Sequence, residues 1–441
     1  MNKVFLKKGK EEPVRRFHPW IFSGAIAKMT VNHREMQIPD GDLVEVVDYK
    51  NQTLAVGYYN DGSIAVRILS FNPSEIIDAD FWQKRLQNAF NYRKRLDLTD
   101  SDTTNAYRLV HAEGDGLPGL IIDIYNETAV VQCHSIGIYR QINAIADALK
   151  MVFKDKLKAI YDKSSETLPP QYIAQNSIKN DYLFGEIITP AIVLENGNQF
   201  AVDWITGQKT GFFLDQRDNR ALISRYSKGK TVLNAFCYSG GFSVYALKAG
   251  AKSVHSIDIS PKAIDLTDKN IAINFELNNE LNNELNSELN NELNSELNNE
   301  LNNELNSELN NELNALKTIN HESTAVDVLQ FLKDNKAVYD VMVVDPPAFA
   351  KSMSKRHNAV QAYKRLNAMA LRQITERGIL FTFSCSQVVD RQLFYDTIVA
   401  AAIEAGRKVR VMHHLTQPAD HPVSMFHPEG SYLKGLVLYV E

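Results

Sequence analysis

Cysteine is scarce in this sequence, and no long apolar run occurs in it. The three cysteines, Cys133, Cys237 and Cys385, are too few and too scattered for a disulfide framework or a Cys-x-x-Cys metal site, so we expect no bound metal. No apolar run approaches the ~18 residues that a membrane helix needs, and the stretch MNKVFLKKGKEEPVRR is too charged for a secretory segment. We therefore expect a cytoplasmic protein with no membrane partner.

The composition is that of an ordinary globular protein. Hydrophobic residues make up 44% and charged residues 23% of the 441 residues. Both fractions are close to the average for soluble proteins, which excludes a collagenous or wholly disordered chain. The length corresponds to two or three domains, because one domain usually has about 100–200 residues.

A tandem repeat interrupts the chain at residues 276–315. Glu-Leu-Asn recurs ten times from Glu276, each time followed by Asn or Ser except in the last unit, which ends at Ala315. Because a helix turns about 100° per residue, a four-residue period winds the leucines around the helix and leaves no fixed apolar face. Asparagine also disfavours a helix. We interpret the segment as a frayed helix or disordered spacer; an ordered oligomerisation element is the alternative, and a homodimer stays open.

The acidic repeat makes the whole chain negative, although the rest of the chain has a positive net charge. The formal net charge is −5, but ten of the 53 acidic residues lie in residues 276–315, which contain no Lys or Arg. Without them, 48 basic residues stand against 43 acidic residues, a balance of +5. The first 34 residues hold eight Lys or Arg against two Glu. This end indicates a polyanionic partner, although a basic run is more often a solvated face.

Two smaller domains are expected before the third. Residues 1–71 contain short apolar runs, such as TLAVGYY and IAVRILS, separated by turn signals, which predicts a small β-barrel. Residues 72–190 include the amphipathic run FWQKRLQNAFNYRKRL, for which Asp80 is placed as the amino-terminal cap. An alternating strand, TAVVQCH, and a helix beginning near Tyr139 follow. We expect this second domain to be α/β.

The third domain, residues 191–441, follows a strand, turn, helix, strand pattern. The runs KTVLNAF, CYSGG, FSVYALKAGA and SVHSIDIS predict a doubly wound α/β fold with a cofactor at the carboxyl ends of parallel strands. Gly240 lets the backbone approach a ligand closely, and Asp258 can accept hydrogen bonds from ribose hydroxyls. The GxGxxG of dinucleotide sites is missing, so S-adenosylmethionine fits better. The alternative is that the glycines permit tight packing and Asp258 caps the next helix.

Three further residues follow later strands of this fold. Asp327 follows the third strand, where it can contact an adenine amino group or cap a helix. Asp345 is followed by two prolines, which fix the backbone and hold the carboxylate at the carboxyl end of the strand VMVV. Cys385 follows the strand GILFTFS. Its thiol is therefore expected in the same crevice as Asp258 and Asp345.

A cysteine in this crevice indicates methylation of a pyrimidine at carbon 5. Carbon 5 is too weak a nucleophile to take a methyl group from a sulfonium, but a thiolate that adds at carbon 6 turns the ring into an enamine whose carbon 5 can attack. A carboxylate such as Asp345 stabilises the charge that develops on the ring. The sequence does not identify the group that removes the carbon 5 proton. The alternative is that Cys385 is an inert buried cysteine.

Together these motifs resemble one known family. The runs NAFCYSGGFSVYALKAGA and SIDIS, the loop DPPAFAK, the turn SCS, the segment ENGNQFAVDWITGQKTGFFLDQRDNR and the terminal HPEGSYLKGL look like the ribosomal RNA large subunit methyltransferase I family. That family is S-adenosylmethionine-dependent and specific for carbon 5 of cytosine. Its amino-terminal barrel is a PUA domain, an RNA-binding module whose opening is similar to RRFHPWIFSGAI. The resemblance covers nearly the whole chain except residues 276–315.

The resemblance implies roles for individual residues. Cys385 is the attacking thiolate, and Asp345 lines the methyl-donor and base pocket. Surface ion pairing is the alternative for two of the cofactor candidates, Lys209 and Arg217. His421 and His427 are interpreted as structural histidines with satisfied ring nitrogens; assistance in proton transfer is the alternative for each. The full cofactor site implied by the resemblance is Phe236, Tyr238, Gly240, Asp258 and Asp327, with Lys209, Asp215, Gln216 and Arg217 packing over the cofactor.

The substrate implied by the resemblance is 23S ribosomal RNA. A base inside an RNA helix is inaccessible at carbon 6, so the enzyme should act on exposed or flipped nucleotides. We expect the barrel to contact phosphates through Lys7, Lys8, Arg15 and Arg16. Two other functions remain open: an RNA methyltransferase that modifies a base nitrogen with the Asp-Pro-Pro loop, and a non-catalytic RNA-binding factor.

Deleting residues 276–311 should leave methyl transfer to ribosomal RNA largely unchanged. The repeat has no fixed apolar face, and its negative charge repels RNA, so catalysis does not need it. Methyl incorporation from labelled S-adenosylmethionine measures the effect, with Tm as the control for folding. Total loss of activity in a variant that still folds contradicts the spacer interpretation.

Overall fold

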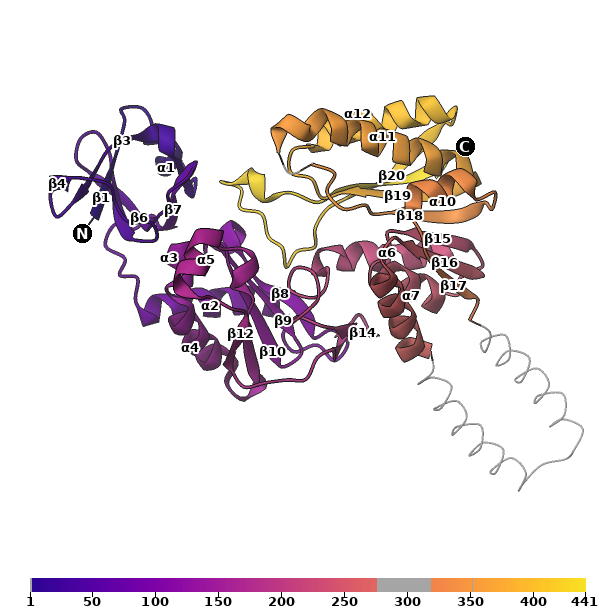
Figure 1. The fold of residues 1–441 in the computed structure, drawn as a ribbon, viewed down its shortest axis with the longest axis horizontal. Coiled ribbons are helices and arrows are strands. Elements are labelled where there is room, and N and C mark those ends of the chain that lie inside the picture. The colour runs from indigo at the N-terminus through magenta and orange to yellow at the C-terminus, as the bar shows by residue number, and fades with distance from the viewer. Residues whose placement is uncertain (1, 276–318, 351) are drawn as a thin grey trace, which may run out of the picture. The chain divides into compact units, whose positions relative to one another are not determined.

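The computed structural model describes residues 2–275, 319–350 and 352–441. The predicted spacer at residues 276–315 therefore lies outside the described residues. The chain divides into two compact units (Figure 1). Unit 1 comprises Met1–Gly197, Val202–Asp215 and Pro418–Ser431, and unit 2 comprises Asn198–Ala201, Gln216–Gln417 and Tyr432–Glu441.

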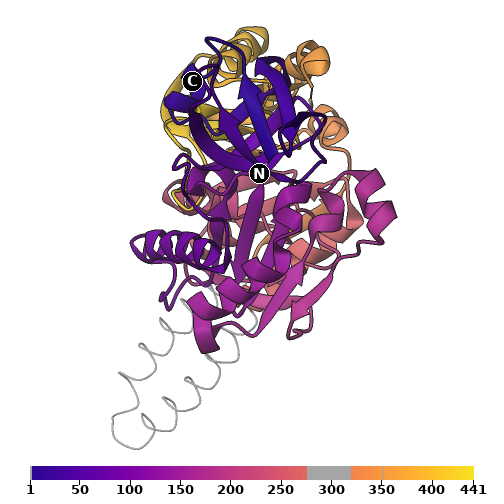
Figure 2. The same cartoon turned by 90° about the vertical axis from the view of Figure 1, so that its left-hand side faces the viewer.

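Unit 1 contains a seven-stranded sheet in the order β2-β7-β6-β5-β1-β3-β4. Strand β1 pairs antiparallel with β3 and parallel with β5, and Figure 2 shows these strands in indigo. Alternating side chains such as Val44 and Val46 fill one apolar core. The strands predicted at TLAVGYY and IAVRILS are confirmed. The elements are β1 (Asn2–Leu6), α1 (Glu12–Arg15), β2 (Trp20–Phe22), β3 (Ile26–Val31), β4 (Arg34–Glu35), β5 (Leu43–Val47), β6 (Thr53–Tyr59) and β7 (Ile64–Ser70).

A second sheet of unit 1 has the order β12-β11-β10-β9-β8. Helices α2 and α4 pack against one another, and Trp82, Leu86 and Leu149 lie fully buried in a core shared with the sheet. This is the predicted α/β arrangement. The elements are α2 (Ala79–Lys94), β8 (Ala106–His111), β9 (Leu120–Tyr125), β10 (Thr128–Cys133), α3 (Ile136–Tyr139), α4 (Ile142–Phe153), β11 (Ala159–Asp162), α5 (Pro170–Asn176) and β12 (Asp181–Phe184).

Two expectations about the helices of this region are wrong. Asp78, not Asp80, caps α2: its Oδ1 accepts the Phe81 N–H at 3.0 Å. Asp78 has the extended backbone that a cap needs, whereas Asp80 already lies inside the first helical turn. The helix expected to begin near Tyr139 is two helices, because α3 ends at Tyr139 and α4 begins at Ile142.

Unit 2 is built on a seven-stranded sheet in the order β17-β16-β15-β18-β19-β21-β20. The first five strands are parallel, and β21 pairs antiparallel with both β19 and β20. The predicted doubly wound arrangement is therefore confirmed. The strands are β15 (Thr231–Ala235), β16 (Ser253–Asp258), β17 (His321–Ala325), β18 (Tyr339–Val344), β19 (Ile374–Ser384), β20 (Val409–Leu415) and β21 (Lys434–Val440). Strands β13 (Ala191–Glu195) and β14 (Asn198–Val202) form a separate two-stranded sheet.

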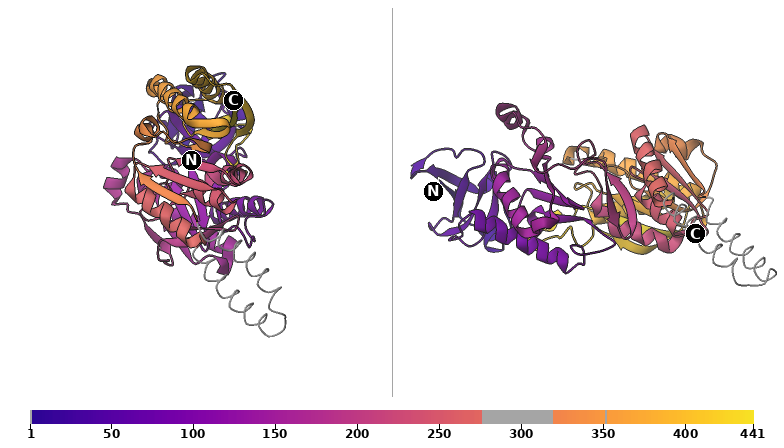
Figure 3. Two further views of the ribbon diagram at one scale, coloured as in Figure 1. Left: turned by 90° about the vertical axis from the view of Figure 1, so that its right-hand side faces the viewer. Right: turned by 90° about the horizontal axis from the view of Figure 1, so that it is seen from below.

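Helices cover both faces of this sheet, as Figure 3 shows from two sides. One face packs against α11 and α12 through residues such as Leu233, Met342 and Leu380. The other face packs against α6 and α7, where the Phe242 and Phe383 rings lie 5.7 Å apart. None of the described helices is long and apolar enough to cross a membrane. The helices are α6 (Arg217–Ser227), α7 (Gly241–Lys248), residues 261–275, α10 (Val328–Asp334), α11 (Arg356–Gln373) and α12 (Arg391–Ala405).

Candidate active site

The parallel strands of unit 2 end along one edge of the sheet. Ala235 pairs with Ile257 on one side and Val344 on the other, and Val344 pairs with Thr382. Because these residues share one row, the residues that follow them leave the sheet at the same edge. This edge carries Phe236, Asp258, Asp345 and the Ser384-Cys385-Ser386 turn, each of which lies at the end of its strand or directly after it.

The turn after β15 is tightly constrained. Phe236 and Tyr238 have left-handed backbone angles, with φ of 62° and 47°, which side chains other than glycine seldom adopt. Gly240 has a φ of 70°, and a Cβ atom there would lie 2.6 Å from Thr267 Cγ2 and 3.1 Å from Thr267 Cα. Only glycine fits at this position. Strained backbone of this kind is concentrated at ligand sites.

Asp258 connects two turns at the carboxyl edge. Its Oδ2 accepts the Tyr238 N–H at 3.1 Å, and its Oδ1 accepts the Ser260 N–H at 2.9 Å. The residue that caps the helix at residues 261–275 is Ser260, whose Oγ accepts the Ala263 N–H at 3.4 Å, so the alternative role of Asp258 as the cap of that helix is not observed. The two bonds fix the orientation of the carboxylate beside the turn after β15.

Asp327 caps a helix. Its Oδ1 accepts the Gln330 N–H at 2.9 Å, and its backbone is extended at the start of α10. The helix-cap alternative for Asp327 is therefore observed. Contact between Asp327 and an adenine stays a prediction.

The orientation of the Asp345 carboxylate is fixed by Gln216, the residue that directly precedes α6. Gln216 Nε2 donates to Asp345 Oδ2 at 2.8 Å. The Gln216 amide is oriented in turn by Asn219, whose Nδ2 donates to Gln216 Oε1 at 2.6 Å and to the Thr416 carbonyl at 3.3 Å. The structure thus brings together Gln216 and Asp345, which are 129 residues apart in the sequence.

The remaining residues of the segment GQKTGFFLDQR are divided between the units. Lys209 and Asp215 belong to unit 1, where Lys209 Nζ lies 3.4 Å from Asp215 Oδ2 and 4.3 Å from the centre of the Phe213 ring. Arg217 belongs to unit 2 and is buried, with its Nε 3.7 Å from Asp218 Oδ1. Surface ion pairing is therefore observed for Lys209, whereas the ion pair of Arg217 involves a buried guanidinium. The cofactor roles of Lys209, Asp215 and Arg217 stay predictions.

Cys385 differs from the other two cysteines in its exposure. It is partly exposed, whereas Cys133 and Cys237 are buried. Burial raises the pKa of the Cys237 thiol to about 12 and that of Cys133 even further. Those two thiols therefore stay protonated at neutral pH. Among the three, Cys385 is the one placed for chemistry.

The turn that holds Cys385 is anchored by a buried lysine. Lys434 Nζ donates to the Ser386 carbonyl at 2.6 Å and to the Val389 carbonyl at 2.7 Å. Burial lowers the pKa of Lys434 to about 8, and the negative charge of Cys385 acts in the opposite direction. Ser386 Oγ also donates to the Ala350 carbonyl at 2.7 Å, which ties this turn to the loop that follows Asp345.

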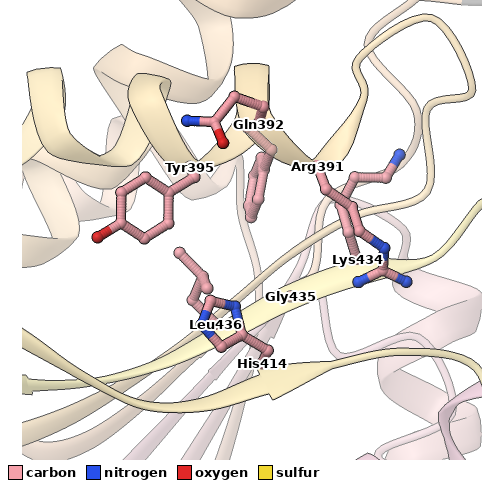
Figure 4. A pocket seen from close by; sticks show the side chains of 8 residues that line it. Arg391, Gln392, Tyr395, His414, Lys434, Gly435 and Leu436 are labelled. Atoms are coloured by element: carbon pink, nitrogen blue, oxygen red, sulfur yellow. The ribbon is translucent and has the colours of Figure 1, made fainter.

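Sequence reasoning did not identify Lys434, although it lies in the quoted run HPEGSYLKGL. A lysine in a strand normally points to solvent, and nothing local shows that this one is buried. Figure 4 shows Lys434 beside Arg391 in a pocket between α12 and the strands β20 and β21. Neither Cys385 nor Asp345 lines that pocket.

A buried tyrosine is near both candidate catalytic groups. The pKa of Tyr363 on α11 is raised to about 12, mainly by burial and in smaller part by the negative charges of Cys385 and Asp345. The Tyr363 hydroxyl is therefore close enough to interact electrostatically with both Cys385 and Asp345. A site with these groups is chemically able to add the Cys385 thiolate to a nucleobase and to stabilise the charge that develops on that base.

The expected phosphate contacts are exposed residues of unit 1. Lys7 Nζ donates to the Gly24 carbonyl at 3.0 Å, and Lys8 Nζ lies 5.8 Å from the centre of the Tyr49 ring. Arg15 forms an ion pair of 2.8 Å with the buried carboxylate of Asp48. Arg15 therefore has a structural role that competes with phosphate binding. The roles of Lys7, Lys8, Arg15 and Arg16 stay predictions.

Two family models match the chain. A PUA-like domain matches residues 4–71, and an S-adenosylmethionine-dependent methyltransferase matches residues 152–282. The second match includes Gly240 and Asp258 but ends before Asp345 and Cys385. The predicted PUA-like domain and the predicted cofactor are confirmed.

Relatives match over nearly the whole chain. Ribosomal RNA large subunit methyltransferase I of Shewanella denitrificans is 36% identical, and the alignment covers 99% of each chain. The proteins of the same name from Photobacterium profundum and Escherichia coli are also 36% identical, and each alignment covers 99% of both chains.

Solved structures share the fold of the entire chain. The crystal structure of SMU.776 complexed with SAH has a TM-score of 0.76 at 21% identity and covers 100% of both chains. A solved chain from Streptococcus mutans has the same TM-score and coverage at 22% identity. The fold, the cofactor class and the resemblance to the family thus agree, and the chain belongs to the ribosomal RNA large subunit methyltransferase I family, whose members are S-adenosylmethionine-dependent methyltransferases of ribosomal RNA.

Proposed function

We propose that this enzyme methylates carbon 5 of a cytosine in 23S ribosomal RNA through a covalent bond to Cys385. The observation that carries the proposal is the position of Cys385: a partly exposed thiol at the carboxyl edge of the parallel sheet, beside the Asp345 loop. The large-subunit RNA of bacteria is the 23S RNA, and the relatives compared above are bacterial. Action on ribosomal RNA also favours a cytoplasmic location.

The proposed chemistry begins with addition of Cys385 Sγ to carbon 6 of the base. The electrons of the carbon 5–carbon 6 double bond form a carbon 4–carbon 5 double bond, and N3 takes a proton from the protonated carboxyl group of Asp345, which recovers it after carbon 5 has been methylated. S-adenosylmethionine supplies the electrophilic methyl group and leaves as the neutral thioether. Carbon 5 takes the methyl group. A base then removes the carbon 5 proton, the double bond re-forms, and the bond between Sγ and carbon 6 breaks.

Preorganisation of Asp345 supports this role. The Gln216 amide fixes the carboxylate at 2.8 Å, and Asn219 fixes Gln216. A carboxylate held before the substrate arrives has little reorganisation to undergo as charge develops on the base.

The cofactor assignment rests on the turn after β15 and on Asp258. The strained backbone at Phe236 and Tyr238 and the glycine at 240 expose main-chain groups to a ligand, and Asp258 is a fixed acceptor suited to ribose hydroxyls. These residues therefore fit the cofactor. Gln216 is assigned to the same site because its side-chain amide donates to Asp345. Asp327, Lys209, Asp215 and Arg217 contribute less to the proposal, because each already has a partner in the protein.

Lys434 is proposed as a positioning residue for Cys385. Its ammonium group is buried and tied to the carbonyls on both sides of the turn at Ser386 and Val389. A positive charge near the thiol favours the thiolate that attacks carbon 6. The domain boundaries at residues 71 and 190 are part of the same proposal, with the chemistry assigned to residues 191–441.

Replacing Cys385 with Ser should reduce methyl transfer at least ~1000-fold, because the nucleophile is lost. RNA that contains 5-fluorocytosine should form a denaturation-resistant adduct with the wild-type protein and none with C385S, since fluorine cannot leave as the carbon 5 proton does. The control is Cys133→Ala, which removes a buried thiol of unit 1 that has no role in the proposed chemistry and should keep both signals. If C385S keeps full activity, the covalent mechanism is contradicted and methylation of a base nitrogen is favoured. If the wild-type protein binds the cofactor but transfers no methyl group, a non-catalytic RNA-binding factor is favoured.

Replacing Lys434 with Met should reduce kcat about tenfold and move the acidic limb of the pH–rate profile to higher pH, because the charge that favours the thiolate is gone. Lys408→Met, at an exposed site of the same unit, is the control. If Lys434→Met lowers the rate but leaves the pH–rate profile unchanged, Lys434 has a structural role only and does not favour the thiolate.

Replacing Lys7 and Lys8 together with Ala should weaken RNA binding and lower the slope of log K against log salt by about 1–2, because about one counterion is released per phosphate contact. The chemical step, measured at saturating RNA, should stay the same. The double variant at Lys84 and Lys158, both exposed in unit 1, is the matched control. If the slope is unchanged, the RNA phosphates do not contact Lys7 and Lys8, and the RNA site lies elsewhere on the protein.

A further inference from the structure

A group of metal-ligating side chains lies in unit 1, in a part of the chain that the proposed chemistry does not use. His18 precedes β2, and His427 and Glu429 belong to the segment Pro418–Ser431. One ligand atom from each of the three lies within 4.8 Å of the others. Within residues 2–275, 319–350 and 352–441, no other set of three or more such residues meets this condition.

His427 is buried without the hydrogen bonds that a buried imidazole normally makes. It is 2% exposed, and neither Nδ1 nor Nε2 has a hydrogen-bond partner. The Trp20 ring covers it, with ring centres 4.3 Å apart. The interpretation of His427 as a satisfied structural histidine is therefore wrong. Buried polar groups without partners are rare and costly, so this ring calls for a ligand outside the protein chain.

The ring of His18 is held beside the Trp20 backbone. Its Nδ1 lies 3.2 Å from the Trp20 carbonyl and also 3.2 Å from the Trp20 backbone nitrogen, whose N–H it can accept. When the Nδ1 proton is donated to the carbonyl, the lone pair is on Nε2, which lies 3.6 Å from Glu429 Oε1. Metal-binding histidines commonly donate their second ring N–H to a backbone carbonyl in this way.

Glu429 connects the two histidines. Its Oε1 faces His18 Nε2, and its Oε2 lies 3.8 Å from His427 Nε2. Ligand atoms around a tetrahedral zinc ion lie about 3.3 Å apart, given bonds of about 2.0–2.1 Å. The side chain of Glu429 is half exposed, so it can make the small inward movement that this geometry needs.

We propose that His18, His427 and Glu429 form a Zn²⁺ site that joins the PUA-like domain to the segment Pro418–Ser431. Two imidazoles and one carboxylate suit zinc, with water as the fourth ligand. The ion gives His427 a partner and links residues about 400 apart in the sequence. All three residues belong to unit 1, whereas Cys385 and Asp345 belong to unit 2, and the proposed chemistry uses none of the three. We therefore assign the site a structural role, as a link between the PUA-like domain and the segment Pro418–Ser431. The cysteine pattern could not predict it, because no thiol takes part.

The test is a titration of untagged, chelator-treated full-length protein with Zn²⁺, followed by calorimetry. We expect one Zn²⁺ per chain with micromolar or tighter affinity and a higher Tm in the zinc-bound form. Glu429→Gln should weaken binding at least about tenfold without disturbing the fold, since its side chain is exposed and the change is isosteric. His427→Ala should do the same. The control is Glu35→Gln, at an exposed site on β4.

A second readout uses Co²⁺, which should quench Trp20 fluorescence in the wild type and in Glu35→Gln but not in Glu429→Gln. Absence of stoichiometric Zn²⁺ binding overturns the proposal. Binding that is unchanged in both Glu429→Gln and His427→Ala places the metal elsewhere and also overturns it. Binding of Fe²⁺ or Mn²⁺ in preference to Zn²⁺ overturns the choice of metal. None of these measurements depends on methyl transfer, so their failure is distinguishable from failure of the proposed function.

Discussion

The register of five parallel strands is the constraint on which the rest of unit 2 depends. Since β17, β16, β15, β18 and β19 run in one direction and pair in a common register, their carboxyl ends meet at one edge of the sheet. Residues far apart in the sequence, such as Asp258, Asp345 and Cys385, are brought to that edge by strand pairing alone. The chemistry we propose needs a fixed carboxylate and a thiol at the same place, and the sheet provides both.

Hydrogen bonds from neighbouring segments then orient each group. Gln216 positions Asp345, Lys434 anchors the turn of Cys385, and backbone amides hold Asp258. In each case the orienting residue comes from a different strand or helix than the residue it orients. The site is therefore stabilised by tertiary contacts, and the strained turn after β15 persists because the packing around Gly240 leaves no other conformation.

Much of this could be predicted from the sequence, for identifiable reasons. Apolar runs ending in Gly, Asp or Pro define strands and their ends, so the doubly wound fold and the positions of Asp258 and Asp345 followed from local pattern. Features that depend on long-range contacts did not follow: the burial of Lys434, and the unsatisfied ring of His427. The cap of α2 was assigned to Asp80 instead of Asp78 because helix ends depend on backbone angles that residue types determine only loosely.

The central claim is that the methyl group goes to carbon 5 of a cytosine, and release of the hydrogen from that carbon tests it most directly. Ribosomal RNA labelled with tritium at carbon 5 of cytosine is incubated with the enzyme and S-adenosylmethionine, and tritium in water is compared with methyl groups in RNA. The account predicts one tritium released for each methyl group transferred. Methyl transfer with all tritium retained in the RNA would contradict it.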